Sequence, residues 1–317
     1  MKYQIGIDIG GTFIKIGLLD EDLNIAARNK IPFPHTTPED MVEKLSAAIE
    51  DLLKTNGISH GDVESLGIVV PGSIDPTGAI VLDAFNLDFH DVPLKALMQA
   101  QFPDIPVLVA NDANGAALAE LYKGAFVGCK TAVLFTLGTG LGGGIILNGH
   151  MFNGGRGGGV EIGHAILVDD GDTCTCGNRG CIEVYCSATG LANEGRKAMK
   201  KYSDSKLHTL SGGDEEKIDA LLVTNCAKAG DPAAVEAFNI YVGHLSSACA
   251  SLYNTLDPEV FAIGGGLSGA GDFLFKPLRE QVSKKCFFKT LGDLVPAVMG
   301  NDAGMVGAAL LHRDAIL

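Results

Sequence analysis

Apolar residues along the chain recur at two spacings, which predicts a protein built from both strands and helices. Short runs rich in Val, Ile and Leu occupy residues 65–70, 107–110 and 260–263, as in buried strands. Residues 39–55 have the spacing that places one apolar face on a helix. A helix of small residues is expected at 303–311, packed back on the N-terminal part. This order of strands and helices is typical of a layered α/β fold.

Two segments, residues 5–19 and 133–147, repeat one pattern and align without a gap. Each consists of an apolar run, a turn rich in Gly and Thr, and a second apolar run, which predicts strand–turn–strand. We therefore expect two similar halves that each open with a glycine-tipped hairpin. The backbone N–H groups of such tips can wrap phosphate oxygens, although two tight turns without a ligand would use some of the same glycines.

The second hairpin contains G-T-G-L-G-G, which formally matches the dinucleotide-binding pattern G-x-G-x-x-G. That pattern requires a helix after the glycines, because the helix N-terminus receives the pyrophosphate. Here residues 145–147 continue as an apolar strand that ends at a turn, Asn148-Gly149. The sequence therefore argues against a dinucleotide-binding unit and favours a phosphate-binding hairpin.

A carboxylate, Asp8, lies inside the otherwise apolar first strand. A charge in that position is costly unless it is paired or binds a metal. At the tip of a phosphate hairpin its natural partner is Mg²⁺, either directly or through water. Thr12 offers a hydroxyl to the same phosphates. Lys15 either offers them a positive charge or is a solvated strand residue.

Polar and glycine-rich turns follow two of the predicted strands at their carboxyl ends, the edge where α/β sheets bind ligands. Residues 111–114, N-D-A-N, come directly after strand 107–110 and before a helix. One such residue would suffice to cap the helix, so we expect Asp112 to have a functional role. Residues 264–266, G-G-G, follow strand 260–263 and either approach a flat base or ribose or form a simple turn.

One stretch, residues 161–183, combines the residue types of a structural metal site. It carries a histidine and three closely spaced cysteines among Asp, Thr, Gly, Asn and Arg. These are His164, Cys174, Cys176 and Cys181, the Cys3His set of a closed tetrahedral zinc site. Isolated thiols or a disulfide are the alternatives. Two acids, Glu161 and Glu183, flank the set, and a structural zinc would fix them and the histidine for a hydroxyl-rich ligand.

Composition limits the classes of function. The 317 residues carry a formal net charge of −14, the opposite sign to that expected of a general binder of nucleic acid or acidic membranes. No apolar run reaches the length of a membrane span. No secretory leader precedes the first strand, and together with reduced cysteines and zinc this indicates a cytoplasmic protein.

The motifs together resemble the ROK family of sugar kinases and related repressors, within the actin-like or ribonuclease-H-like ATPase superfamily, along nearly the whole chain. The resemblance depends on D-I-G-G-T at 8–12, V-P-G at 70–72, N-D-A-N at 111–114, G-T-G-L-G-G-G at 138–144, E-I-G-H at 161–164, C-T-C-G-N-R-G-C-I-E at 174–183 and I-G-G-G at 263–266. It implies an α/β fold with two actin-like domains, an interdomain cleft and a structural zinc site. The small N-terminal domain would comprise residues 1–114 and 302–317, and the large domain, residues 115–301, would carry the zinc motif.

Carried over position by position, the family's binding roles fall on three sets of residues. The ATP phosphates and Mg²⁺ would be held by Asp8, Gly10, Gly11, Thr12, Gly138, Thr139, Gly140 and Gly142, beside the Lys15 proposed above from its charge. The adenosine would lie against Gly264, Gly265 and Gly266. The sugar hydroxyls would be bound by Gly72, Asn86, Asn111, Asp112, Glu161, His164 and Glu183. His164 would bind zinc through its other ring nitrogen.

The activity that the resemblance implies is ATP-dependent phosphorylation of a hexose at its 6-hydroxyl, with Asp112 as the base that accepts the hydroxyl proton. The chain is most similar to family members that act on glucose; N-acetylmannosamine, N-acetylglucosamine, allose, mannose and fructose are alternative substrates. A sugar-responsive repressor and a sugar-binding protein without catalysis are alternatives of other classes. A homodimer is the default expectation, with a tetramer as the alternative.

Two departures from the family pattern lie on the sugar side. Val160 precedes Glu161 where a smaller residue is usual, and no tryptophan follows Asn86-Leu87, where Phe89 is nearby. These departures weaken the identification of the hexose rather than of the reaction.

Overall fold

The structure, a computed structural model, describes residues 2–157 and 159–314. The chain forms two compact units: Met1–Lys130 with Gly144–Val160 and Met299–Leu317, and Thr131–Gly143 with Glu161–Val298. The actin-like domain division predicted from the sequence, with boundaries at 114/115 and 301/302, stays a prediction. Residues 1, 158 and 315–317 of these predicted domains lie outside the described residues.

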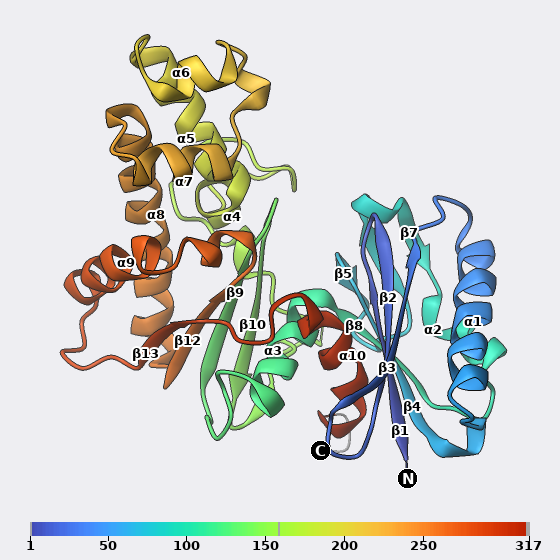
Figure 1. Cartoon of the computed structure of the whole chain (residues 1–317). Coiled ribbons are helices and arrows are strands. Elements are labelled where there is room, and N and C mark those ends of the chain that lie inside the picture. The colour runs from blue at the N-terminus through green and yellow to red at the C-terminus, as the bar shows by residue number, and fades with distance from the viewer. Residues whose placement is uncertain (1, 158, 315–317) are drawn as a thin grey trace. The chain divides into compact units, whose positions relative to one another are not determined.

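The first unit is built on a five-stranded sheet with the order β3-β2-β1-β4-β8 (Figure 1). The strands are β1 (Tyr3–Ile9), β2 (Phe13–Leu19), β3 (Ile25–Pro32), β4 (Val63–Val70) and β8 (Val107–Asn111). Neighbours among β1, β2 and β3 pair antiparallel, whereas β4 pairs parallel with both β1 and β8. The predicted strand–turn–strand at residues 5–19 is therefore confirmed as the β1–β2 hairpin.

The carboxyl ends of β1, β4 and β8 lie at one edge of this sheet because the three strands run parallel. The segments that follow them are the hairpin tip at 10–12, Pro71-Gly72, and the start of α3 (Asp112–Lys123). The topology of the first unit thus gathers its predicted phosphate and sugar residues at a single edge, where ligands of α/β sheets bind.

Helices cover both faces of the first sheet (Figure 1). The apolar sides of α1 (Pro38–Thr55) and α2 (Leu94–Gln101) pack on one face, and α3 and α10 (Ala303–Asp314) pack on the other. The predicted C-terminal helix is confirmed as α10, which contacts β1, β2 and β4. A Cβ at Gly6 or Gly67 would overlap the backbone of α10, so glycine in the strands permits this close approach.

A small antiparallel sheet completes the first unit beside β8. It consists of β5 (Ser73–Ile74), β6 (Val81–Ala84) and β7 (Phe89–Val92), in that order. This sheet carries the segments next to Gly72 and Asn86, so it holds two of the predicted sugar residues.

The second sheet has the order β11-β10-β9-β12-β13, which repeats the arrangement of the first. Its strands are β9 (Ala132–Leu137), β10 (Leu141–Leu147), β11 (His150–Met151), β12 (Val260–Gly264) and β13 (Asp293–Pro296). β10 and β11 pair antiparallel, whereas β12 pairs parallel with both β9 and β13. The second predicted strand–turn–strand is confirmed as β9 and β10, and β10 is divided between the units after Gly143.

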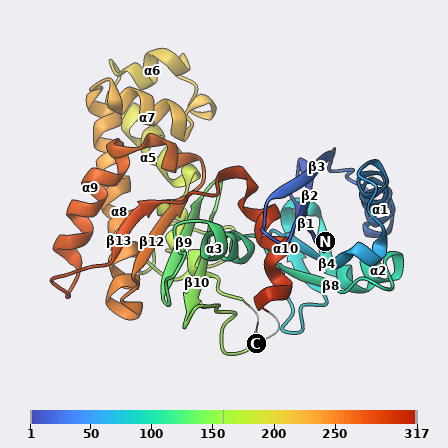
Figure 2. The ribbon, with the colours of Figure 1, turned by 60° about the horizontal axis from the view of Figure 1, so that its bottom comes forward.

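Four helices of the second unit pack on one long helix, α8 (Pro232–Leu256), which Figure 2 shows beside α9. These are α4 (Ile182–Cys186), α5 (Ala188–Lys201), α7 (Ala220–Lys228) and α9 (Asp272–Lys285), whereas α6 (Lys206–Ser211) packs on α5 and α7. The fully buried Tyr241 of α8 donates its hydroxyl hydrogen to the Cys186 carbonyl oxygen at 2.8 Å, which fixes α4 on α8. Among the residues that the structure describes, no helix has the length and apolar character needed to cross a bilayer.

Candidate active site and metal centre

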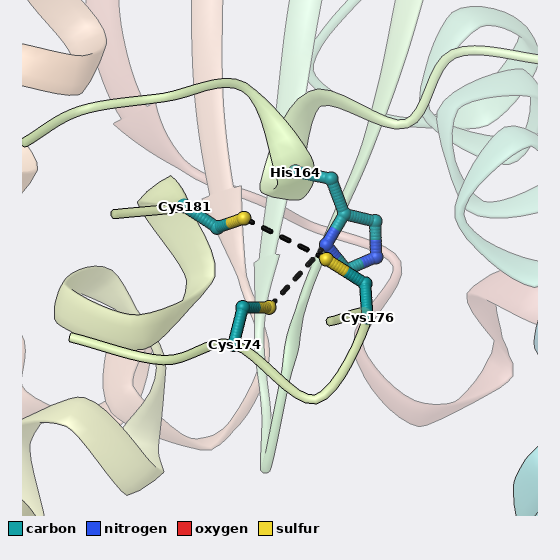
Figure 3. A group of neighbouring side chains, drawn as sticks. All are labelled: His164, Cys174, Cys176 and Cys181. Atoms are coloured by element: carbon teal, nitrogen blue, oxygen red, sulfur yellow. Dashed lines mark hydrogen bonds between the residues drawn. The ribbon is translucent and has the colours of Figure 1, made fainter. Parts of the chain in front are cut away.

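The predicted metal ligands converge in the second unit (Figure 3). The ligand atoms of His164, Cys174, Cys176 and Cys181 all lie within 4.8 Å of one another. The Cys174 Sγ is 3.7 Å from the His164 Nδ1, and the Cys176 and Cys181 Sγ atoms are also 3.7 Å apart. Two sulfur ligands at about 2.3 Å from a tetrahedral zinc would be about 3.8 Å apart, so the group has the size of a closed zinc site.

Short local structure places these four ligands. His164 ends the 3-10 turn Ile162–His164, and Cys181 immediately precedes α4. The loop between them folds back on itself through isolated bridges, Ile166 to Cys181 and Thr173 to Arg179. Gly180 has a φ of 78°, and a Cβ there would overlap the Val168 carbonyl. Glycine is therefore required next to a ligand for the loop to close.

The thiols of the group differ in their electrostatic surroundings. A backbone hydrogen bond from Asn178 lowers the pKa of the exposed Cys176. Burial raises the pKa of Cys181 to about 12. A metal cation would outweigh this difference, because thiolates are the form that binds metal.

Two acids, Glu161 and Glu183, lie near this group of possible metal ligands. The carboxylate of Glu183, in the first turn of α4, accepts a hydrogen bond from the Leu141 backbone N–H at 2.9 Å through Oε2. Its Oε1 lies 3.8 Å from the Cys174 Sγ. Burial removes water from around the Glu161 carboxyl group and so raises the pKa of Glu161. The charge of His164 opposes this shift, and the charge of Glu183 adds to it. These three groups thus form one electrostatic cluster of hydrogen-bonding side chains.

The second glycine hairpin lies directly beside this cluster, because Glu183 bonds to it. The Gly138 N–H donates to the Gly140 carbonyl across the tip at 3.0 Å. Gly265, after β12, has a φ of 82°, and a Cβ there would overlap the backbone of Leu137. The two loops predicted to bind nucleotide, residues 138–142 and 264–266, are therefore neighbours within the second unit.

The first hairpin contains an ion pair that sequence reasoning did not identify. The Lys15 Nζ lies 2.9 Å from the Asp8 Oδ2, and it also donates to the Asn301 carbonyl oxygen at 2.9 Å. The two residues stand directly opposite each other on β1 and β2, a register that a tip at 10–12 would have indicated. The buried-strand carboxylate is thus paired, the first of the two solutions expected for such a charge.

At the start of α3, neighbouring residues have distinct hydrogen bonds. The Asn111 Oδ1 accepts from the N–H groups of Ala113 and Asn114 at 2.8 and 3.3 Å, which is a helix N-cap. The Asn111 Nδ2 donates to the Gly72 carbonyl oxygen at 3.0 Å, which joins two predicted sugar residues. The Asp112 Oδ1 accepts from the Ala113 N–H at 2.8 Å, and the residue is half-buried.

The remaining predicted residues of the first unit lie near these. Asn86 is exposed within the 3-10 turn Phe85–Leu87. A Cβ at Gly11 would contact the Asn86 carbonyl oxygen at 3.1 Å, so the first hairpin tip approaches the Asn86 turn. Gly72 has a φ of 106°, where a Cβ would overlap the Asp83 carbonyl, so this position of the V-P-G motif requires glycine.

Comparison with known proteins places these motifs in one family. The ROK family profile matches residues 4–315. Glucokinases from Streptomyces coelicolor and Thermotoga maritima are 35% and 36% identical to the chain, over 99% and 98% of it and 98% of each relative. The structure of a ROK family glucokinase from Streptomyces griseus in complex with glucose and AMPPNP superposes with a TM-score of 0.81 at 35% identity, covering 98% of both chains. The α/β fold is that of ROK kinases, and the chain belongs to the ROK family.

Proposed function

We propose that this protein transfers the γ-phosphoryl group of ATP to the 6-hydroxyl of glucose. The observation that carries the proposal is its full-length similarity, at about 35% identity, to proteins named glucokinase. One structural relative at the same identity was crystallised with glucose and AMPPNP, a nonhydrolysable analogue of ATP. The polar residues expected to bind both ligands are present in the chain.

The base in this proposal is Asp112. A sugar hydroxyl is a weak nucleophile at neutral pH, and a carboxylate in contact with it accepts its proton as the phosphorus is attacked. The capping function at the start of α3 is met by Asn111. The Asp112 carboxylate that follows lies at the edge of the sheet where ligands bind, which supports its assignment as the base.

The phosphates of ATP are assigned to the two glycine hairpins. The donors would be backbone N–H groups at the two tips, those of Gly11, Thr12, Thr139 and Gly140, with the Thr12 hydroxyl and the Lys15 ammonium in addition. Asp8 is assigned to Mg²⁺, whose charge would neutralise the developing negative charge on the transferred group. The Lys15 Nζ, 2.9 Å from the Asp8 Oδ2, holds this carboxylate in a defined orientation next to the hairpin tip. The glycines 264–266 are assigned to the adenosine.

The sugar hydroxyls are assigned to the residues that the family resemblance indicates. These are Gly72, Asn86, Asn111, Asp112, Glu161, His164 and Glu183. Two carboxylates and an imidazole in one electrostatic cluster suit a ligand with several hydroxyls. Each hydroxyl of such a ligand can donate or accept a hydrogen bond.

We assign a structural Zn²⁺ to His164, Cys174, Cys176 and Cys181. The distances within the group support tetrahedral coordination, and four protein ligands leave no open position for substrate or an activated water. The metal would act on the reaction through the positions of Glu161, His164 and Glu183. A cytoplasmic homodimer that functions in carbohydrate metabolism, as in glycolysis, completes the proposal.

The test is ATP consumption with a panel of sugars: glucose, mannose, fructose, allose, N-acetylglucosamine and N-acetylmannosamine. These differ by single groups, which a site that hydrogen-bonds hydroxyls discriminates strongly. We expect the highest kcat/KM for glucose. A higher value for another hexose would correct the substrate, and the absence of phosphorylation with every sugar would refute the kinase assignment.

A further inference from the structure

The tip of the second glycine hairpin is tied to a single segment, residues 183–189, by three hydrogen bonds. The Glu183 Oε2 accepts from the Leu141 N–H at 2.9 Å. The Ala188 N–H donates to the Gly138 carbonyl at 2.8 Å. The Thr189 hydroxyl donates to the Thr139 carbonyl at 2.7 Å. All of these residues belong to the second unit.

A glycine-rich turn binds phosphate well only if hydrogen bonds hold its flexible backbone in one conformation. Gly138, Gly140 and their glycine neighbours have no side chains that could hold the tip in one conformation. Donors aimed at phosphate contribute most when they are oriented before the ligand binds. The ties to residues 183–189 supply that order from outside the hairpin.

The geometry of the peptide bond determines which N–H group each of these hydrogen bonds orients. A peptide unit is planar and trans, so its C=O and the N–H of the next residue point in opposite directions. Holding the Gly138 carbonyl toward Ala188 therefore turns the Thr139 N–H away from that segment. Holding the Thr139 carbonyl toward the Thr189 hydroxyl turns the Gly140 N–H away in the same manner. Two successive donors are thus directed outward from the tip.

We propose that Thr189 is a positioning residue for ATP: its hydroxyl fixes the peptide unit between Thr139 and Gly140, so that the Gly140 N–H is oriented toward a nucleotide phosphate. This inference rests on the proposed kinase function. Thr189 acts through the hairpin backbone and lies outside the sets assigned to sugar and metal.

Thr189 can be substituted with little structural side effect. Its side chain is exposed. The cap of α5 is made by the Ser187 hydroxyl, which accepts from the Gly190 N–H at 3.1 Å. Valine has the shape of threonine without the hydroxyl, whereas serine retains the hydroxyl. Thr255 provides a matched control, because it is also exposed in a helix and donates to a backbone carbonyl, that of Ser251, at 2.7 Å.

The experiment measures initial rates with ATP varied at saturating glucose, and with glucose varied at saturating ATP. Calorimetric binding of AMPPNP is measured in parallel. Thr189→Val should lower kcat/KM for ATP by about tenfold, the loss expected for one misoriented hydrogen bond. It should weaken AMPPNP binding and leave the KM for glucose within about twofold. Thr189→Ser should restore the ATP parameters, and Thr255→Val should match the wild type.

The outcomes separate this inference from the kinase assignment. If the wild type phosphorylates no sugar, the proposed function fails, and AMPPNP binding by the variants still decides the role of Thr189. Wild-type ATP parameters in Thr189→Val would overturn the inference. An equal loss for ATP and glucose, or a failure of Thr189→Ser to restore ATP binding, would indicate a structural role and would also overturn it.

Discussion

At the scale of single residues, Asn111 and Asp112 at the start of α3 are adjacent but have different hydrogen bonds. Asn111 caps the helix and bonds to the Gly72 carbonyl, so replacing it would loosen the local backbone. Asp112 is the first helical residue, and its carboxylate is not needed as the cap. The base role proposed for Asp112 would therefore give the N-D-A-N motif a second function beside the cap that Asn111 forms.

Asp112→Asn should lower kcat by about 10²–10⁴-fold while sugar binding and stability are retained. The amide has the shape of the carboxylate but does not accept a hydroxyl proton. Steady-state kinetics and calorimetric sugar titration measure both effects. Asp272→Asn is the matched control, since Asp272 is the first residue of α9 as Asp112 is of α3. A normal kcat in Asp112→Asn would exclude this residue as the base.

Glu120→Ala should lower the free energy of unfolding by at least about 2 kcal/mol. The Glu120 carboxylate is 1% exposed and accepts from the backbone N–H groups of Ala125 and Met299 at 2.7 and 2.8 Å. Removal would leave these donors without that acceptor in the interior of the first unit. Urea denaturation measures the change, and Glu43→Ala, at an exposed position of α1, should shift it by no more than about 0.5 kcal/mol. Equal effects in the two variants would refute the role of Glu120.

At the scale of elements, local patterns predicted the hairpins and the helices that begin and end with clear signals. The helix expected at 39–55 is α1, Pro38–Thr55, and the one expected at 303–311 is part of α10. The small sheet β5-β6-β7 had no such signal, because β5 has two residues and β7 reads F-H-D-V, with polar residues at its centre. The strands of this sheet form because they pair with one another, and this pairing cannot be predicted from the composition of each segment.

The contact between α3 and α10 depends on glycine at the crossing point. A Cβ at Gly307 would overlap the Gly115 carbonyl, so the two backbones touch there. Gly307→Ala should therefore destabilise the protein by about 1–3 kcal/mol, the range for overpacking, despite the better helix propensity of alanine. Urea denaturation measures the loss. Gly155→Ala is the control, because a Cβ at Gly155 would meet no atom within 4 Å. An unchanged or higher stability of Gly307→Ala would contradict this packing argument.

At the scale of the whole molecule, the predicted repeat corresponds to two sheets of the same strand order. The convergence of His164, Cys174, Cys176 and Cys181 was predictable because these residues are close in sequence and their spacing is informative. The ties from Glu183 to Leu141 and from Thr189 to Thr139 span 42 and 50 residues. A threonine or a backbone amide can hydrogen-bond to many groups, so the sequence does not indicate its partner. These contacts could therefore be identified only from the three-dimensional structure.

The proposed zinc ligands, the two nearby acids and the second hairpin all belong to one unit. The chain from Cys181 continues directly into Glu183 and then into the segment that ties the hairpin. Removing the metal should therefore loosen residues 161–187 and the tip at 138–141. The sheet of the first unit has its own core and should remain protected.

Metal analysis of the purified protein should find about one zinc per chain, and chelation should abolish sugar phosphorylation. Hydrogen exchange should increase in the two segments just named, while the amides of β1 and β4 keep their protection. Cys181→Ser should reproduce the chelated state, because Cys181 is buried and is one of the four proposed zinc ligands. Cys226→Ser, a buried thiol of α7 outside the group, should keep the zinc and the activity. A zinc-free, folded protein with full activity would show that the position of Glu183 does not depend on the metal.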